Sequence, residues 1–466
     1  MKAPTAAKTV GELRSFEYPY RSVKDEMRHN LIEKLRSKEP IFPGIVGYED
    51  TVIPQVTNAI IAGHDIILLG ERGQAKSRIM RSLIGLLDEK IPIIEGCEIN
   101  DHPYQPICKR CRDLLTKMGD DTPIEWIGPD RRYGEKLATP DVTIADLIGE
   151  VDPIKVAEGR YLSDELTIHY GLIPRTNRGI FAINELPDLA EKIQVGLLNV
   201  MEEKDVQIRG YKIRLPLDIF IVASANPEDY TSRGRIITPL KDRFGAQIRT
   251  HYPSTIDEEI EIMLNEGFVD KTISDVRVPK FMLEIVAELS HLARRSPHVS
   301  QHSGVSVRMS ISNYETLVAC AIKRASQLGE KLAVPRICDL YYLIASTLGK
   351  IELDSIEEGR EEQIVDRLLK TAVHNIFQKY FSGYRFTDLI QKFESGLTVE
   401  TGESMPSQAY QKYITLPDIP GALQRLNCTP SNVEIAASCI EFVLEGLHLD
   451  KKLNKEQLAN KVTYRR

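Results

Sequence analysis

The sequence predicts an α/β domain with a parallel sheet, followed by helical domains. Four apolar runs typical of buried strands occur in the first half of the chain, separated by helical segments: Asp65–Leu69, Ile91–Ile94, Gly179–Ile183 and Asp218–Ser224. Strands joined through helices favour a parallel sheet. After about residue 255 the strand pattern stops, and apolar residues follow helical spacing in three segments: Phe281–Arg295, Ile311–Leu328 and Arg336–Leu348.

Size and composition narrow the class of protein. The chain has 466 residues, enough for two or three domains with substantial cores. With 42% hydrophobic and 27% charged residues it reads as globular, and its net charge of −7 gives no overall attraction for nucleic acid. The polar start lacks a signal peptide's apolar core, and no apolar run reaches the ~20 residues of a membrane span. We expect a cytoplasmic protein that contacts neither membrane nor nucleic acid.

The composition shifts along the chain predict four parts. These are a helical segment at residues 1–40 (helix Val23–Arg36), an α/β core at 41–255, a small helical domain at 256–350 and a mostly helical extension at 351–466. Within the extension we expect a charged helix at 351–379, a break at 395–407 and helices near Asn432–Leu447 and Lys455–Val462.

A glycine-rich loop follows the first apolar run directly. It reads Gly70-Glu71-Arg72-Gly73-Gln74-Ala75-Lys76-Ser77, and a helix continues from Arg78. Loop N–H groups and the helix N-terminus suit phosphates, Lys76 neutralises β/γ charge, and the Ser77 hydroxyl reaches Mg²⁺. Ala75 stands where glycine is usual; alanine tolerates helical φ/ψ, so we expect the loop to be kept, with less backbone freedom. The loop predicts an ATP site with Mg²⁺.

Polar side chains end the next strands of the predicted sheet. The run Gly179–Ile183 leads into Asn184 and Glu185, and Asp218–Ser224 leads to Asn226. Because the carboxyl ends of parallel strands meet at one edge, these residues are expected beside the loop. Glu185 is the expected general base, and Asn226 would hydrogen-bond the attacking water or the γ-phosphate. Asn184 keeps an oxygen toward Mg²⁺ but lacks the negative charge of the usual aspartate.

Two arginines complete the predicted site. Arg243, in the segment Asp242–Gly245, is expected to stabilise phosphoryl-transfer charge in a neighbouring subunit. Arg308, near the start of a helix in the second half of the chain, is expected to reach back to the nucleotide.

Taken in this order, these motifs resemble the AAA+ ATPases, specifically the magnesium chelatase ATPase subunit and MoxR-like branch, over about residues 40–350. The resemblance implies an AAA+ P-loop NTPase core followed by a helical lid. Alanine before the lysine is familiar in MoxR-like proteins. The implied roles are Walker A for Lys76 and Ser77, Walker B for Asn184 and Glu185, sensor 1 for Asn226, arginine finger for Arg243, sensor 2 for Arg308, and adenine packing for Val46 and Gly47 within Ile45–Tyr48.

The same resemblance implies a function. It is ATP hydrolysis that remodels or metal-loads a partner protein, in a ring, expected to be hexameric, with a von Willebrand A-domain partner. One alternative is a nucleotide-gated scaffold with little hydrolysis, motivated by Asn184. Another is a DNA-acting motor or transcription activator, against which the acidic balance and the lack of a Gly-Ala-Phe-Thr-Gly-Ala loop weigh.

The long spacing between Lys76 and Glu185 predicts insertions. Residues 149–174 resemble the helix-2 insert of this branch, and alternation around a glycine predicts a hairpin at Val206–Arg214.

Another insertion, near residues 97–111, contains Cys97, Cys108 and Cys111 with His102 between them. A Cys-x₂-Cys pair can bind one tetrahedral metal, and Cys97 with His102 would complete four zinc ligands. A packing or redox-sensing dithiol and unrelated surface cysteines are the alternatives. Seven cysteines in all, an odd number, do not indicate a disulfide framework. The other four lie on apolar helical faces and are expected to be buried thiols: Cys320, Cys338, Cys428 and Cys439.

Overall fold

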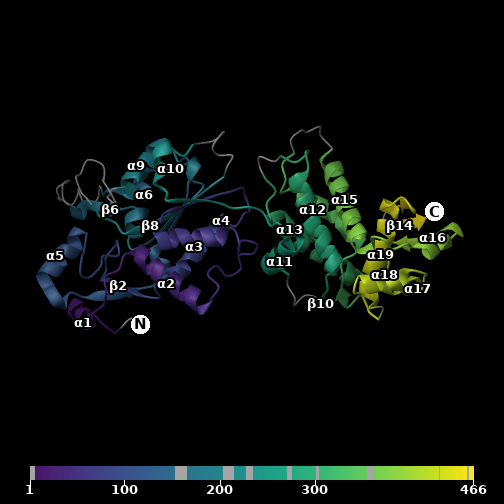
Figure 1. The fold of residues 1–466 in the computed structure, drawn as a ribbon, viewed down its shortest axis with the longest axis horizontal. Coiled ribbons are helices and arrows are strands. Elements are labelled where there is room, and N and C mark those ends of the chain that lie inside the picture. Colours follow the sequence, from purple (N-terminus) through teal and green to yellow (C-terminus); the bar gives the residue numbers. More distant parts are fainter. Residues whose placement is uncertain are drawn as a thin grey trace. The chain divides into compact units, whose positions relative to one another are not determined.

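The structure is a computed structural model that describes residues 6–152, 165–202, 215–226, 235–269, 275–300, 304–353, 360–429, 431–458 and 461–466. The chain forms two compact units, Met1–His251 and Tyr252–Arg466. In Figure 1 the first unit runs from purple to teal and the second from green to yellow.

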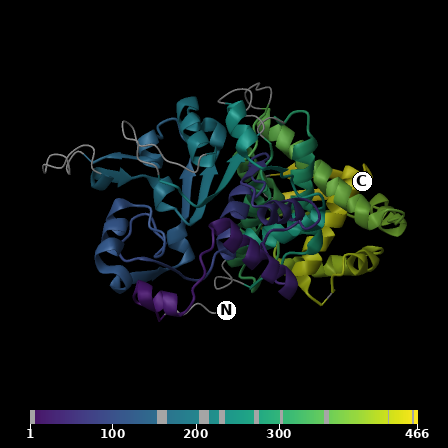
Figure 2. The same cartoon turned by 60° about the vertical axis from the view of Figure 1, so that its left-hand side comes forward.

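A five-stranded parallel sheet organises the first unit, as predicted. Its strand order is β4-β7-β8-β1-β9, and Figure 2 shows its strands as neighbouring arrows. The strands are β4 (Tyr133–Leu137), β7 (Gly179–Asn184), β8 (Ile219–Ala225), β1 (Ile66–Leu69) and β9 (Ala246–Arg249). Three of the four predicted strands thus occupy its centre.

The fourth predicted strand forms but lies outside this sheet. β2 (Ile91–Ile94) pairs antiparallel with β3 (Ile124–Ile127) in a separate two-stranded sheet. The two edge strands, β4 and β9, were not predicted. Both mix charged and apolar residues, which an edge position tolerates because one side of the strand is unpaired.

Side chains of the central strands alternate between two cores, as the period of a strand requires. Ile66, Leu68 and Phe220 face a core shared with α2 (Val23–Ser37), α3 (Val52–Ala62) and α4 (Lys76–Ser82). Ile67, Phe181 and Ile221 face a second core shared with α9 (Glu191–Glu202), α10 (Thr238–Arg243) and the cysteine-containing insertion. The N-terminal helix α2 therefore belongs to the hydrophobic core of this unit.

A buried ion pair ties α2 to the sheet. The fully buried guanidinium of Arg132 donates to both carboxylate oxygens of Glu26, at 2.7 and 2.6 Å, and to the Arg178 carbonyl at 2.8 Å. Removing one partner of such a pair costs about 3–5 kcal/mol, because the other charge stays buried.

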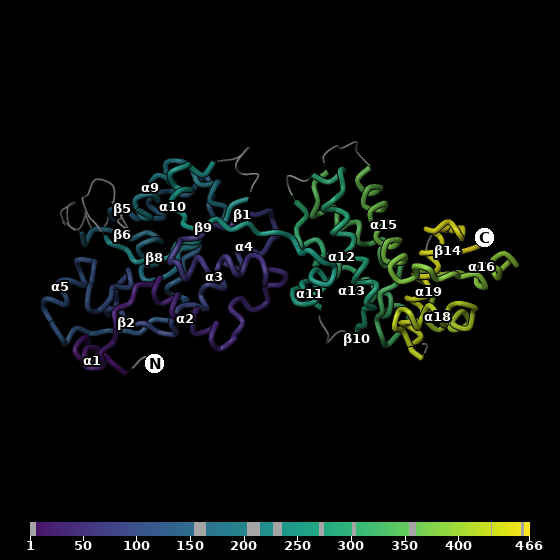
Figure 3. Tube along the Cα trace, in the orientation of Figure 1, coloured from purple at the N-terminus to yellow at the C-terminus, as the bar shows by residue number. Residues whose placement is uncertain are grey.

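The insertions add small elements around the sheet. Helix α5 (Lys109–Met118) lies between β2 and β3 in the chain, and α1 (Val10–Ser15) lies beside this region, where Val10 and Leu13 pack with Ile124 (Figure 3). Further along, α6 (Ile144–Leu147) precedes β5 (Gly149–Val151), which pairs antiparallel with β6 (Ile168–Tyr170), and α8 (Leu172–Arg175) follows. The predicted hairpin Val206–Arg214 and residues 153–164 of the predicted helix-2 insert lie outside the described residues.

The second unit is mainly helical. Its helices are α11 (Ile256–Glu266), α12 (Lys280–Arg295), α13 (Arg308–Leu328), α14 (Leu343–Leu348), α15 (Glu361–Phe381), α16 (Thr387–Glu394), α17 (Gln411–Ile414), α18 (Ile419–Arg425) and α19 (Val433–Leu449). A pair of two-residue strands, β10 (Asp275–Val276) and β11 (Leu332–Ala333), is parallel. One hydrophobic core runs from Ile260 on α11 to Tyr464, so residues 256–350 and 351–466 pack around shared side chains. Among described residues, no helix combines the length and apolar character needed to cross a membrane.

The predicted helix at Lys455–Val462 is wrong. β13 (Asn454–Leu458) and β14 (Lys461–Arg465) are antiparallel, and β14 also pairs with β12 (Val399–Thr401). The Tyr464 side chain is buried and its hydroxyl donates to Glu445 of α19 at 2.5 Å. β14 pairs both with the adjacent β13 and with β12, which lies about sixty positions earlier, and local periodicity could not show the pairing with β12. The predicted burial of four cysteines holds for Cys428 and Cys439, whereas Cys320 and Cys338 are half-buried.

Candidate nucleotide site and cysteine cluster

The glycine loop joins central strand β1 to helix α4, the strand-loop-helix order that the sequence predicts. Gly73 and Ala75 both have left-handed backbones, with φ of 77° and 53°. Ala75 therefore does not use the helical φ/ψ that alanine tolerates, but a left-handed conformation that glycine adopts more readily. An L-residue pays roughly 1–2 kcal/mol in this conformation, which identifies Ala75 as a strained position at the start of the helix.

Two residues of the loop brace its backbone. A Cβ at Gly70 would lie 1.9 Å from Thr250 Oγ1 and 2.2 Å from Gln74 Oε1, so a side chain at this position would collide with both. Gln74 Oε1 accepts hydrogen bonds from the Glu71 N–H at 3.1 Å and the Thr250 hydroxyl at 2.7 Å. The buried Gln74 side chain thus links two parts of the loop backbone to Thr250 through hydrogen bonds.

Lys76 and Asn226 are in direct contact. The Lys76 Nζ donates to the Asn226 Oδ1 at 2.8 Å, to the Glu71 carbonyl at 2.7 Å and to the Gly70 carbonyl. The register that pairs Leu69 with Ala225 places Asn226, the residue after β8, beside the start of the loop. The ammonium group is thereby buried among oxygen acceptors at the carboxyl end of the sheet.

Ser77 and Asn184 also meet. The Ser77 hydroxyl donates to Asn184 Oδ1 at 3.0 Å, and the Ser224 hydroxyl donates to the same oxygen at 3.2 Å. The Asn184 Nδ2 donates to Glu135 Oε1 at 2.5 Å. Because a carboxylate only accepts hydrogen bonds, Glu135 holds the amide nitrogen and leaves the amide oxygen facing Ser77.

Glu135 is a site residue that the sequence interpretation missed. It lies on edge strand β4, and both of its carboxylate oxygens pair with Arg81 of α4, at 2.8 and 2.9 Å. The Arg81 hydrogen bonds lower the pKa of Glu135 below its ordinary value. Its strand was not predicted and its partner Asn184 is distant in sequence, so the only local signal was a charged residue in a short polar run.

Glu185 directly follows β7 with a left-handed backbone, at φ 57°. Its N–H donates to the Ser224 hydroxyl at 3.1 Å. The Ser224 hydroxyl therefore hydrogen-bonds both the Asn184 side chain and the Glu185 backbone, the two predicted Walker B residues.

The segment Ile45–Tyr48 contacts the loop through its tyrosine. The Tyr48 hydroxyl lies 2.9 Å from the Gln74 carbonyl and 2.7 Å from the His251 carbonyl, and burial raises its pKa to about 12. A Cβ at Gly44 would lie 2.5 Å from an Arg78 guanidinium nitrogen, so Arg78 covers this segment. Packing of Val46 and Gly47 on adenine stays a prediction, as do contacts of Arg72 and Arg78 with the nucleotide.

The two predicted arginines lie in different units. Arg243 ends α10 of the first unit, where its guanidinium pairs with Glu202 at 2.6 Å and Asp242 at 3.3 Å. Arg308 begins α13 of the second unit. Their roles as arginine finger and sensor 2 stay predictions.

The cysteine cluster differs from the predicted ligand set at one position. Ligand atoms of Cys97, Asp101, Cys108 and Cys111 lie within 4.8 Å of one another, and all four residues are buried. His102 is outside this group: its Nδ1 accepts the Tyr104 N–H at 3.0 Å, and its ring packs against the rings of Tyr20 and Tyr104. The left-handed backbone of Asn100, at φ 54°, precedes this turn of the chain, in which Asp101 takes the position expected for His102.

Comparisons with known proteins identify relatives of this chain. A family model described as Sigma-54 interaction domain matches residues 158–242, which include β7 and β8. The chain is 29% identical over 243 residues to the magnesium-chelatase 38 kDa subunit of Cereibacter sphaeroides, covering 50% of this chain and 65% of that protein. It is 30% identical over 237 residues to the subunit of the same name from Rhodobacter capsulatus, covering 50% of this chain and 62% of that protein. The chain thus spans less than two thirds of these relatives.

Among solved structures, the chain is similar to one in a model of the complex between subunits BchI and BchD of magnesium chelatase. Identity is 22%, coverage is 70% of this chain and 98% of that one, and the TM-score is 0.37. A TM-score below 0.5 supports no conclusion about shared arrangement, so the relationship is stated from the sequence relatives alone. By sequence the chain is related to magnesium-chelatase 38 kDa subunits, at 29–30% identity over half of its length.

Proposed function

We propose that this protein binds and hydrolyses Mg²⁺-ATP and uses the cycle to remodel or metal-load a partner protein. The observation that carries the proposal is the hydrogen-bonded set Lys76–Asn226 and Ser77–Asn184, which joins the glycine loop to the ends of two parallel strands. Loop, lysine and strand-end amides are the groups that a polyphosphate site needs, and three separate segments supply them.

The residues at hand fit the roles. Lys76 is held by carbonyl and amide oxygens, and phosphate oxygens are acceptors of the same kind with more negative charge. Ser77 and Asn184 offer a hydroxyl and an amide oxygen, which are ligand types suited to Mg²⁺ and its bound water. When bound, Mg²⁺ neutralises phosphate charge. Glu185 accepts a proton from the attacking water, which Asn226 orients.

Glu135 supplies a negative charge close to position 184, where asparagine replaces the usual aspartate. Its carboxylate is hydrogen-bonded to the Asn184 amide, so a negative charge stands one strand away from the usual position. We infer that this arrangement keeps Asn184 Oδ1 available to the metal, which favours retained Mg²⁺ binding over loss of the site.

Calorimetry with ATP and Mg²⁺, followed by steady-state phosphate release, tests the proposal. We expect binding and turnover in the wild-type chain. Binding with ATP-dependent oligomerisation but turnover near zero would support the nucleotide-gated scaffold instead. No heat with adenine nucleotides plus Mg²⁺ would refute both.

We further propose that the chain assembles into a ring, hexameric by resemblance, in which Arg243 reaches the neighbouring site. Its guanidinium is partly exposed and held by surface carboxylates, so an exchange of partner costs little. A von Willebrand A-domain protein is the proposed partner. Sedimentation of the Glu185→Gln chain with ATP tests the ring, and affinity capture with the same variant tests the partner.

A further inference from the structure

We propose that Cys97, Asp101, Cys108 and Cys111 form a closed zinc site that anchors the insertion to the sheet. This site is independent of nucleotide, and the aspartate replaces the histidine that spacing alone suggested.

The geometry suits one tetrahedral ion. Zn–S bonds of about 2.3 Å place the ligands of a tetrahedron roughly 3.8 Å apart, and the four ligand atoms here lie within 4.8 Å of one another. Small side-chain rotations close that difference. Three thiolates with one carboxylate are a soft, anionic set that favours Zn²⁺ over Mg²⁺ or Ca²⁺.

Backbone N–H groups already point at the sulfurs. Cys108 caps the N-terminus of the ten-residue helix α5, and its Sγ accepts the Cys111 N–H at 3.4 Å. The Cys97 Sγ accepts the Asp101 N–H at 3.3 Å. Such donors favour the thiolate form, which is the form that binds metal.

Asp101 supplies the second, independent observation. Its Oδ2 accepts the Cys108 N–H at 3.0 Å, whereas its Oδ1 is buried and has no hydrogen-bond partner among the described residues. Leaving a buried acceptor unpaired destabilises the folded state, and more so for a charged group. A cation among the four residues would be the partner of this oxygen.

His102 also has a buried nitrogen without a partner among the described residues, its Nε2. Because its Nδ1 accepts the Tyr104 N–H, a neutral ring carries its proton on Nε2. That nitrogen then has no lone pair for a metal, which favours Asp101 as the fourth ligand.

The cluster lies where the insertion meets the rest of the unit. All three cysteines belong to the core on one face of the sheet. Asn100 donates to the carbonyls of Arg175 and Asn177, at 2.9 and 3.3 Å, and Asn177 donates back to the Ile99 carbonyl at 3.0 Å. These contacts reach the segment just before β7, the strand that ends in Asn184.

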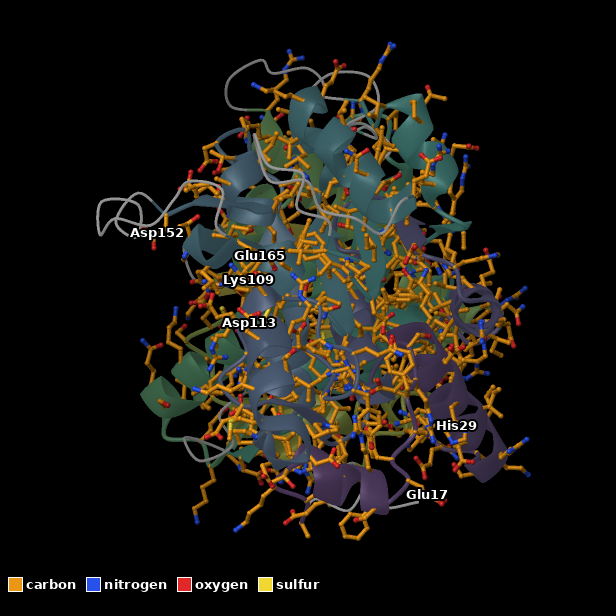
Figure 4. All side chains as sticks on the ribbon, turned by 90° about the vertical axis from the view of Figure 1, so that its left-hand side faces the viewer. Glu17, His29, Lys109, Asp113, Asp152 and Glu165 are labelled. Carbon is orange, nitrogen blue, oxygen red and sulfur yellow. The ribbon has the colours of Figure 1, made fainter. Side chains whose placement is uncertain are left out.

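On the helix side, Glu165 accepts the Lys109 N–H at 2.8 Å and the Arg112 guanidinium at 2.7 Å, and Figure 4 shows Lys109 and Glu165 side by side. With four buried protein ligands no position stays open for substrate, so the role is structural.

Metal analysis of the purified full chain, grown with zinc, tests the proposal. We expect one zinc per chain in the wild type and in two controls, His102→Ala and Cys428→Ser. Cys108→Ser is expected to lose the metal, and Asp101→Asn to bind it at least about 10-fold more weakly. Cobalt-substituted wild type should show thiolate-to-cobalt charge-transfer absorption.

If Cys108→Ser fails to fold, a chelator series on the wild type decides: zinc release with a lower unfolding temperature supports the site. Absence of zinc, with an unfolding temperature indifferent to chelator, would overturn it. Metal loss in His102→Ala with full retention in Asp101→Asn would overturn the ligand assignment.

Discussion

The glycine loop and the cysteine cluster both follow buried strands, β1 and β2. They differ in whether their polar side chains find hydrogen-bond partners within the protein. At the nucleotide site, the side chains of Lys76 and Asn184 each make at least three hydrogen bonds to protein atoms. In the cluster, one oxygen of Asp101 has no partner among the described residues. A site whose groups are already paired can exchange partners during a cycle, whereas the cluster is complete only with a permanent cation.

The largest expected effect is on ATP turnover at the nucleotide site, with nucleotide affinity unchanged. Glu185→Gln removes the general base, and we expect turnover to fall by roughly 10²–10⁴-fold while nucleotide affinity stays near that of the wild type. Phosphate release and fluorescent-nucleotide titration measure the two quantities. Zinc content, unchanged in this variant, is the control that keeps the two sites distinct. Preserved turnover would show that another group acts as the base.

Lys76→Ala tests whether the partners of the loop are exchangeable. The lysine would bind phosphate through several charge-assisted hydrogen bonds, each contributing about 1.5–3 kcal/mol, so we expect at least a roughly 100-fold loss of nucleotide affinity. Calorimetry with ATP and Mg²⁺ is the measurement. Wild-type turnover in this variant would refute the site assignment. Loss of zinc in this variant would show that the cysteine cluster depends on the nucleotide site.

Glu135→Gln probes the amide orientation of Asn184. A glutamine at 135 can present either oxygen or nitrogen, so the Asn184 amide is no longer fixed, and we expect about a 10-fold higher Mg²⁺ requirement for nucleotide binding. Glu125→Gln, which removes another arginine-paired carboxylate of the same unit, is the matched control. An identical Mg²⁺ requirement in both variants would mean that Asn184 is oriented without Glu135.

The smallest effect concerns pH. Hydrogen bonds from Arg81 lower the pKa of Glu135. A lowered carboxyl pKa means that its contribution is present above the ordinary ionisation range and is lost only as pH falls through the lowered value. We therefore expect that ionisation of Glu135 does not change the Mg²⁺ requirement between about pH 5 and 8. A change centred in that range, absent from Glu135→Gln, would contradict this assignment.

The two regions also differ in how far their residues could be predicted. The loop was predictable because strand, glycines, lysine and helix are consecutive, and the partner residues Asn184 and Asn226 end apolar strands. The cluster was predictable in its cysteines but not in its fourth ligand, since Asp101 and His102 are adjacent and their spacing to Cys108 differs by only one position. Edge strand β4, and with it Glu135, had no apolar run to mark it.

By itself the sequence determined the three central strands of the sheet, the phosphate loop and the cysteine spacing, because these depend on neighbouring residues. Only the tertiary structure decided that Ala75 adopts a left-handed backbone, that β2 leaves the main sheet, that the segment after α19 pairs as strands with β12, and which side chains meet at Asn184 and Asp101. The strand pairings and the contacts of Asn184 depend on hydrogen bonds between segments far apart in the chain, which leave no local pattern. The Asp101 contact joins residues close in sequence, but adjacent residues can fill the same position only one at a time, and the backbone path decides which one does.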